Sequence, residues 1–258
     1  MTNYTQLLSV CFSFLVLFKA NFTLGSSQTV QSIFYKKVFL FTGYPGSGKG
    51  TQGKIIAQKL GIIHLSTGEL YRAEVKTGSE VGRQMDVFMK KGQIIPKELT
   101  FDYLRRELKK SKYQKGIILD GYPKNKESYD FIFTCLEELG FEVPGVFYFD
   151  ISREKVTERL CGRLLCKDCE KNYHKVFLPP KEEGVCDHCN ENLSYRSDDT
   201  VEAIAKRLDS YEFNTFPLLG LYKKIKILHR IPADGTIDQI SRVIAVLMIQ
   251  LSKNKGEL

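Results

Sequence analysis

The stretch Lys37-Val-Phe-Leu-Phe-Thr42 leads directly into Gly43-Tyr-Pro-Gly-Ser-Gly-Lys49-Gly-Thr51, and this junction decides the fold. The apolar run has the length and aromatic content of a buried parallel strand. The following residues match G-x-x-x-x-G-K, in which glycines let backbone N–H groups close around phosphate oxygens and lysine adds a mobile positive charge. A helix predicted over 49–60 begins at this loop, so its N-terminal N–H groups face the anion. The stretch therefore predicts a phosphate-binding strand–loop–helix unit.

Four further apolar runs predict the rest of a sheet, at 61–65, 116–120, 145–150 and 225–231. Longer helical patterns separate them. In the pattern over 201–211, helical spacing predicts that the core residues are Val201, Ile204, Leu208 and Tyr211. Strands that alternate with helices predict an α/β fold with a five-stranded, doubly wound parallel sheet. Ligands of such sheets bind just past the carboxyl ends of the strands, where the polar motifs of this chain fall.

The composition is that of a folded globular protein, with 43% hydrophobic and 26% charged residues in a chain of 258. This length suits one α/β domain with inserted segments, or two small domains. The net charge of +8 raises the question of a nucleic-acid partner. Lysine and arginine are dispersed, however, and several lie within motifs that a small phosphorylated substrate would need. We expect no nucleic-acid partner, and we expect a monomer.

Four of the seven cysteines have metal-ligand spacing, because sixteen residues separate Cys166-x-x-Cys169 from Cys186-x-x-Cys189. Four thiolates leave no open coordination position, so the spacing predicts a structural Zn²⁺. Two other hypotheses are a nucleic-acid zinc ribbon, which the flanking arginines disfavour, and two redox Cys-x-x-Cys pairs, which the paired spacing disfavours. The remaining cysteines are expected to be small apolar fillers, namely Cys11, Cys135 and Cys161.

The segment Gly43–Gln52 resembles the loop of nucleoside monophosphate kinases, and of adenylate kinases above all, and the resemblance extends over roughly residues 38–250. It implies a P-loop kinase domain at 37–258, interrupted by a nucleoside-monophosphate-binding segment at 66–95 and by a zinc-held lid at 162–199. It also implies reversible, Mg²⁺-dependent transfer of phosphate from ATP to AMP, giving two ADP. The implied ATP-binding residues are Gly46, Ser47, Gly48, Lys49, Gly50, Thr51, Arg163, Asn172, Tyr173 and Ile237.

The segment from His64 to Arg72, the stretch Gly92–Ile95 and Asp120-Gly-Tyr-Pro123 resemble the acceptor side of these kinases. We expect His64 itself to be a hydrogen-bonded core histidine. The AMP-binding residues implied are Thr67, Arg72, Gln93, Ile94, Ile95, Gly121, Tyr122, Pro123, Lys124, Ser128, Arg196 and Arg207.

Two positions depart from the family pattern on this acceptor side. Lys124 stands where the family has arginine, and it loses the bidentate guanidinium fork. Ser128 stands where the family usually has a glutamine that grips adenine, and it is too short for two-point hydrogen bonding. Two alternatives therefore stay open: the same chemistry with another pair (GTP:AMP, or UMP or CMP as acceptor), and a weakly active nucleotide-binding regulatory protein.

Phosphoryl transfer through a loose transition state needs alignment and charge neutralisation more than covalent help. The resemblance places seven residues in this role: Lys49, Lys124, Arg159, Arg163, Arg196, Arg207 and Asp120, the last to orient waters bound to Mg²⁺. Asp198 and Asp199 are expected at the lid hinge or in its ion pairs, and Gly235, like Ile237, is expected to present backbone to the donor adenine.

Residues 1–36 form a hydrophobic leader, in which the apolar run Leu7–Phe18 is too short for a confident membrane span. Its length suits a signal-peptide core, although no Lys or Arg precedes it. The first acidic residue of the chain is Glu69, which is typical of an organelle transit segment. An organelle interior also suits reduced zinc-binding cysteines. We expect an organelle such as a mitochondrion or plastid, with membrane contact only through an uncleaved leader; an uncleaved tail on a cytoplasmic protein is the alternative.

Overall fold

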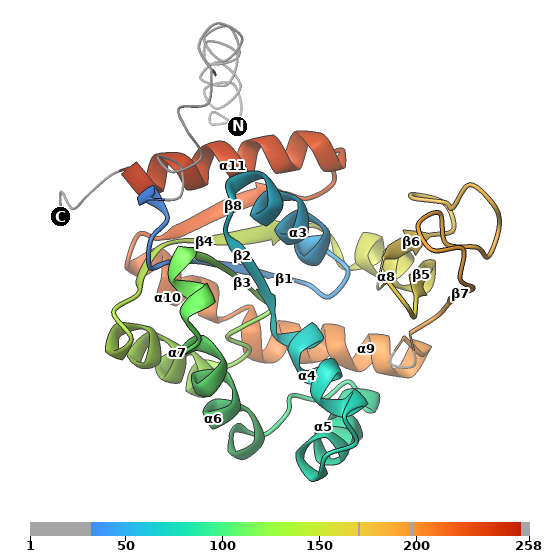
Figure 1. The fold of residues 1–258 in the computed structure, drawn as a ribbon, viewed down its shortest axis with the longest axis horizontal. Coiled ribbons are helices and arrows are strands. Elements are labelled where there is room, and N and C mark those ends of the chain that lie inside the picture. The colour runs from blue at the N-terminus through green and yellow to red at the C-terminus, as the bar shows by residue number, and fades with distance from the viewer. Residues whose placement is uncertain (1–31, 170, 197–198, 254–258) are drawn as a thin grey trace, which may run out of the picture.

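The computed structural model describes residues 32–169, 171–196 and 199–253. Its central sheet has five strands in the order β2-β3-β1-β4-β8, and every neighbouring pair is parallel (Figure 1). From β1 the chain passes to the edge strand β2 and returns to β3 beside β1, and it then crosses to β4 and finally to β8 on the other side of β1. Because this order reverses beside β1 (Lys37–Gly43), the carboxyl end of that strand opens into a crevice, and the phosphate-binding loop lies there. The predicted α/β class and five-stranded parallel sheet are confirmed.

The remaining elements follow the predicted alternation. The other strands of the central sheet are β2 (Ile63–Ser66), β3 (Ile117–Asp120), β4 (Glu142–Asp150) and β8 (Leu228–Pro232). The helices are α3 (Lys49–Leu60), α4 (Thr67–Lys76), α5 (Glu80–Lys90), α6 (Lys97–Leu108), α7 (Lys126–Glu138), α8 (Arg153–Cys161), α9 (Val201–Ser210), α10 (Leu218–Lys224) and α11 (Ile237–Lys253), with a 3₁₀ turn η1 (Ser111–Lys115) and a π-helical turn η2 (Tyr211–Thr215).

Two apolar cores cover the two faces of the sheet, because successive side chains of a strand point to opposite faces. Phe39 and Phe41 of β1 pack with residues of α3 and α11. Val38 and Leu40 pack on the other face with residues of α6, α7 and α10. Figure 1 shows α3 and α11 together on one side of the sheet and α6, α7 and α10 on the other. Every residue of β1 is buried, as expected of a strand at the centre of a doubly wound sheet.

Two excursions leave this core. Helices α4 and α5 pack on each other around a small apolar cluster that contains Tyr71 and Met85. The second excursion is a separate three-stranded antiparallel sheet of β5 (Arg163–Cys166), β6 (Asn172–His174) and β7 (Leu193–Ser194). In Figure 1 this small sheet projects from one end of the molecule, between α8 and α9 in sequence. The excursions fall within the predicted segments 66–95 and 162–199.

Details of two sequence predictions are wrong. Val201 is 72% exposed rather than buried, because it is the first residue of α9 and precedes the turns that pack on the core. Cys161 is exposed, as the last residue of α8, whereas Cys135 is buried as predicted. Cys11 and most of the predicted leader lie outside the described residues. Among the described helices, none combines the length and apolar character needed to cross a membrane.

Candidate active site

The phosphate-binding loop has the geometry that its glycines predict. Gly46 and Gly48 adopt φ of 83° and 96°, a conformation that side chains with a Cβ rarely reach. A Cβ at Gly46 would also meet Leu160 at 2.8 Å. The Lys49 ammonium group donates to the carbonyl oxygens of Gly43 at 2.8 Å and Tyr44 at 2.7 Å, so it lies inside the loop. The side chain is partly buried, and burial lowers its pKa to about 8 against the opposing attraction of Asp120.

Asp120 ends β3 beside the phosphate-binding loop. A Cβ at Gly50 would lie 3.5 Å from its Oδ2, so the first turn of α3 faces this carboxylate. Nε2 of His64 lies 3.3 Å from the same oxygen, and both side chains are buried, in agreement with the expectation of a hydrogen-bonded core histidine. The Thr67 hydroxyl donates to the carbonyl oxygens of Asp120 and Gly121 at 3.2 Å each. Thr67 thus uses its side chain to hold the end of β3.

Three of the predicted arginines lie around the junction between the main domain and the small sheet. Arg163 donates to both carboxylate oxygens of Asp199, at 2.6 to 2.8 Å, and Arg207 donates to Oδ1 at 2.5 Å. The Asp199 side chain is 0% exposed. Burial alone would raise the pKa of Asp199, but the two arginines outweigh burial and lower it. Arg196 donates to Oδ1 of Asn172 at 3.0 Å. The expected role of Asp199 in hinge ion pairs is confirmed; Asp198 lies outside the described residues.

Burial lowers the pKa of Arg163, and repulsion from Arg196 adds to this effect. The same guanidinium also lowers the pKa of Lys49, as does Lys124. Three positive groups therefore converge around the phosphate-binding loop, with Asp120 as the acidic group that opposes them. Such a concentration of partly buried positive charge is suited to a ligand that carries several negative charges.

The other residues predicted for catalysis or for binding the donor nucleotide contact other parts of the protein. Arg159 donates to the carbonyl oxygen of Ala233 at 3.0 Å, which brings α8 against the turn after β8. The carbonyl oxygen of Ile237 accepts from Gln52 at 2.9 Å, so α11 and α3 are tied together beside the loop. Tyr173 is buried in the small sheet, and its hydroxyl lies 3.4 Å from Sγ of Cys186.

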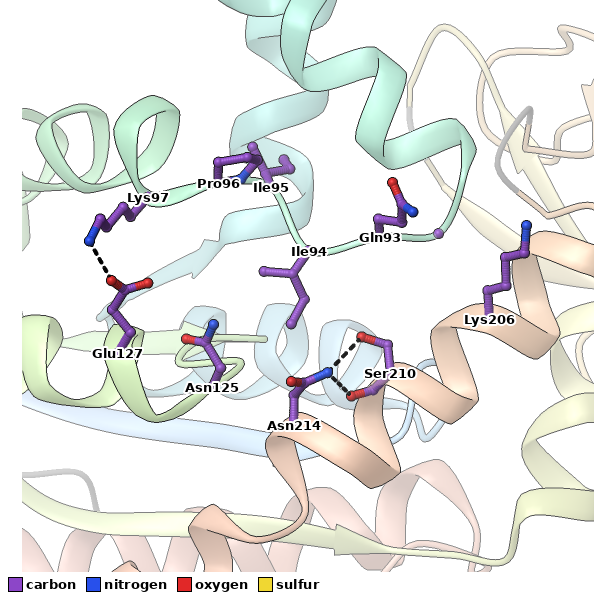
Figure 2. Close-up of a pocket in the computed structure, with 11 residues that line it drawn as sticks. Gln93, Ile94, Ile95, Pro96, Lys97, Asn125, Glu127, Lys206, Ser210 and Asn214 are labelled. Carbon is purple, nitrogen blue, oxygen red and sulfur yellow. Dashed lines mark hydrogen bonds and ion pairs between the residues drawn. The ribbon is translucent and has the colours of Figure 1, made fainter.

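A cleft of about 470 Å³ lies between the α5–α6 connection and the α9–η2 segment (Figure 2). The predicted residues Gln93, Ile94 and Ile95 line one side, and Figure 2 shows Ile94 directed toward the opposite wall. Gly92 packs closely on that wall, since a Cβ there would meet the carbonyl oxygen of Ala203 at 2.7 Å. Residues that the motifs did not indicate complete the lining, namely Pro96, Lys97, Asn125, Glu127, Lys206, Ser210 and Asn214.

A smaller cavity of about 30 Å³ adjoins this cleft, and Tyr122, Lys124 and Ser128 contribute to its lining. The Ser128 hydroxyl is already engaged, because it closes a capping box with Asn125 at the start of α7. Among the other residues predicted for the acceptor, Arg72 lies on α4 with its guanidinium beside Gly68, and Pro123 follows Tyr122 in the turn after β3. The structure thus brings six of the twelve predicted acceptor residues to the linings of the cleft and the small cavity beside it.

The four predicted metal ligands come together at the end of β5 in the small sheet. Their Sγ atoms all lie within 4.8 Å of one another, and two pairs are separated by 3.3 and 3.5 Å. A tetrahedral Zn²⁺ with Zn–S bonds of about 2.3 Å requires S···S distances of about 3.8 Å, so the donor set fits this ion. His174 does not belong to the group: its Nδ1 accepts from the N–H groups of Val176 and Phe177 at 3.0 Å each.

A parallel α/β sheet, a phosphate-binding loop and an adjoining nucleotide-sized cleft define a P-loop phosphotransferase of the nucleoside monophosphate kinase class. Comparison with known proteins identifies the family. The sequence model described as Adenylate kinase matches residues 41–227. The chain is 37% identical to the adenylate kinase of Desulforamulus reducens over 207 residues, which cover 80% of this chain and 97% of that protein. It is 38% identical to the adenylate kinase of Carboxydothermus hydrogenoformans over 201 residues, covering 78% and 94%. The chain belongs to the adenylate kinase family.

Proposed function

We propose that this chain transfers the γ-phosphoryl group of Mg·ATP reversibly to AMP, giving two ADP. The residues proposed to carry the transfer are Lys49, Asp120, Lys124, Arg159, Arg163, Arg196 and Arg207. The enzyme is a nucleoside monophosphate kinase of the adenylate kinase type. One observation carries the assignment of the site: the Lys49 ammonium group lies inside the phosphate-binding loop, 2.8 and 2.7 Å from the carbonyl oxygens of Gly43 and Tyr44, where further charged side chains act on it. A phosphate chain that enters this loop therefore meets positive groups from both sides.

Lys49 binds the donor phosphates in this account. Its ammonium group rests on the carbonyl oxygens of Gly43 and Tyr44. Phosphate oxygens would replace these carbonyl oxygens as its acceptors, and their negative charge would restore the ordinary pKa that burial lowers. The N–H groups of the loop and of the first turn of α3 bind the same phosphates. The phosphates are thus aligned before any group moves.

Arg163 and Arg207 neutralise charge on the transferred group. In the structure Asp199 holds both guanidinium groups at the junction with the lid. A phosphoryl group in transit presents the same bidentate oxygen acceptors as this carboxylate. Arg163 is thus already held in a bidentate arrangement that suits phosphate, with Arg207 beside it, and closure of the lid over the donor nucleotide would exclude water.

Mg²⁺ fits the donor set at the end of β3, where the carboxylate of Asp120 faces the phosphate-binding loop. The ion supplies charge neutralisation between the phosphate groups when it is bound with the nucleotide. Asp120 would orient its water ligands, and His64 would orient Asp120. Zn²⁺ fits the four thiolates and would hold the lid strands together without taking part in transfer.

Two proposals concern the setting of the enzyme. Residues 1–36, of which 1–31 lie outside the described residues, are proposed to direct the chain to an organelle, on the strength of the acid-poor sequence before Glu69 and the reduced cysteines that zinc requires. Fusion of residues 1–40 to a fluorescent protein tests this directly, and diffuse cytoplasmic fluorescence would contradict it. The enzyme is proposed to act as a monomer, which light scattering tests.

A panel of donors and acceptors tests the proposed specificity. The purified chain is assayed with ATP or GTP as donor and with AMP, UMP, CMP or GMP as acceptor, and nucleoside diphosphates are separated by chromatography. ATP with AMP should give the largest kcat/KM. A preference for UMP or CMP would overturn the acceptor assignment, and a GTP preference would overturn the donor assignment. A Lys49→Met variant controls for contaminating kinase.

A further inference from the structure

The small cavity beside the acceptor cleft is lined by two residues whose buried hydroxyl groups have no partner in the described part of the chain. The side-chain oxygens of Tyr71 and Tyr122 are buried and have no hydrogen-bond partner among the described residues. The two residues are only 3% and 4% exposed. Buried polar groups are nearly always hydrogen-bonded, because an unsatisfied one costs most of its lost hydration. Two such groups together indicate a site that a ligand completes.

Both hydroxyl groups belong to residues that line the same small cavity. Tyr71 comes from α4 and Tyr122 from the turn after β3, and both line the cavity of about 30 Å³. Ionisation of Tyr71 would raise the pKa of Tyr122 further, after burial itself, as expected of neighbouring hydroxyl groups. Burial also raises the pKa of Tyr71, so both groups stay protonated at neutral pH and each can donate and accept.

This small cavity adjoins the acceptor cleft. Ile94, Ile95, Lys97, Asn125 and Glu127 line both spaces. The cavity has room for about one water molecule, whereas the cleft can hold a nucleotide. A purine in the cleft would therefore extend only its polar edge, or one bridging water, to the tyrosine hydroxyl groups.

The residue that the family pattern assigns to the base edge is not free for this purpose. Ser128 accepts from the backbone N–H groups of Lys124 and Asn125 at 3.0 Å each, and its hydroxyl donates within the capping box. Thr100 lines the same cavity, and its hydroxyl group donates to the carbonyl oxygen of Pro96 at 3.2 Å. The two tyrosines thus carry the unsatisfied hydroxyl groups of the cavity lining.

We propose that Tyr71 and Tyr122 are specificity-determining residues whose hydroxyl groups bind the 6-amino edge of the acceptor adenine, directly or through one water. This inference rests on the proposed function, because it assigns the base edge of the same acceptor. It makes the selection of AMP a property of two elements, α4 and the turn after β3, that meet only in the folded chain.

The test combines enzyme and substrate changes. Tyr71→Phe and Tyr122→Phe are assayed at saturating ATP with AMP and with purine riboside 5′-monophosphate, which lacks the 6-amino group. Each variant should raise the KM for AMP about fivefold to tenfold, as expected for the loss of one buried hydrogen bond, with kcat and the KM for ATP little changed. The advantage of AMP over purine riboside 5′-monophosphate should shrink by a similar factor.

Tyr222→Phe is the matched control, because Tyr222 is also buried but lies in the core between Tyr129 and Phe133. It should leave the ratio between the two acceptors unchanged. The proposal is overturned if both cleft variants keep the wild-type ratio, or if their KM for ATP rises as much as that for AMP. Failure of the wild-type enzyme to phosphorylate AMP would instead overturn the proposed function, so the two failures are distinguishable.

Discussion

Replacement of Asp199 by asparagine removes the charge that holds two buried arginines at the lid junction. The Asp199 side chain is 0% exposed, and Arg163 and Arg207 donate to it at distances from 2.5 to 2.8 Å. Loss of one partner from a buried ion pair costs about 3–5 kcal/mol. Asparagine keeps the volume and one acceptor oxygen, so we expect about 3 kcal/mol. For a chain of this size that corresponds to a fall in Tm of about 6–12 °C.

Thermal unfolding with and without ligand separates a functional role from a merely structural one. Because we propose that phosphate oxygens bind the same guanidinium groups, a non-hydrolysable Mg·ATP analogue with AMP should raise the Tm of Asp199→Asn more than that of the wild type. Asp209→Asn is the matched control: Asp209 is 65% exposed and pairs with Arg153 at 2.6 Å, so its loss should cost less than about 1 kcal/mol.

Two results would contradict the role given to the ion pairs of Asp199. A destabilisation of Asp199→Asn no larger than that of Asp209→Asn would show that the buried pair contributes little. An equal rise in Tm on ligand binding in wild type and variant would show that the phosphates do not take over the position of the Asp199 carboxylate.

Three other perturbations test separate parts of the site. Lys49→Met should lower kcat at least 100-fold with unchanged circular dichroism. Lys59→Met, at the exposed end of α3, is the control and should leave kcat unchanged. Near-normal turnover of Lys49→Met would contradict the phosphate-loop assignment. Since burial lowers the pKa of Lys49 to about 8, kcat/KM for ATP should fall above that pH while kcat persists to higher pH, and a flat profile would count against this role. Between pH 8 and 10.5 the Lys49 amine is protonated in the unfolded chain but largely neutral in the folded one, so the contribution of Lys49 to the free energy of unfolding rises with pH over this window. Urea titrations should show this rise in the wild type and not in Lys49→Met. Metal analysis of reduced protein should find about one zinc per chain. Removal of the zinc by a chelator should lower the Tm while the central sheet stays folded at room temperature. Metal-free protein of unchanged stability would contradict the zinc lid.

The centre of the sheet was predictable from sequence because β1 and β3 are buried on both faces. Continuous apolar runs such as 37–42 and 116–120 carry that signal, and each ends at a glycine or a carboxylate. The start of α3 was predictable because Lys49 follows a glycine loop, and its end because Gly61 adopts a left-handed conformation. The exposure of Val201 was not, because helical spacing indicates a face but not where along the helix that face leaves the core.

The candidate site was predictable to the extent that local motifs define it. Lys49, Asp120 and the four cysteines stand in short patterns whose spacing reports their chemistry. The position of Tyr71 in the cavity depends on how α4 packs against the turn after β3, and no pattern within either segment encodes that contact. Asn214 lines the cleft for a similar reason, since it lies in a π-helical turn after α9 that periodicity does not indicate. Tertiary packing, rather than local sequence, determines these residues.

In its proposed function, this chain moves a phosphoryl group between nucleotides and does not release it to water. Phosphorus NMR of the purified full chain with Mg²⁺, ATP and AMP measures this directly, with a parallel sample that lacks AMP. We predict two ADP formed for each ATP consumed, and negligible inorganic phosphate in either sample. Consumption of ATP at the same rate without AMP, with release of inorganic phosphate, would contradict phosphoryl transfer between nucleotides as the function of this chain.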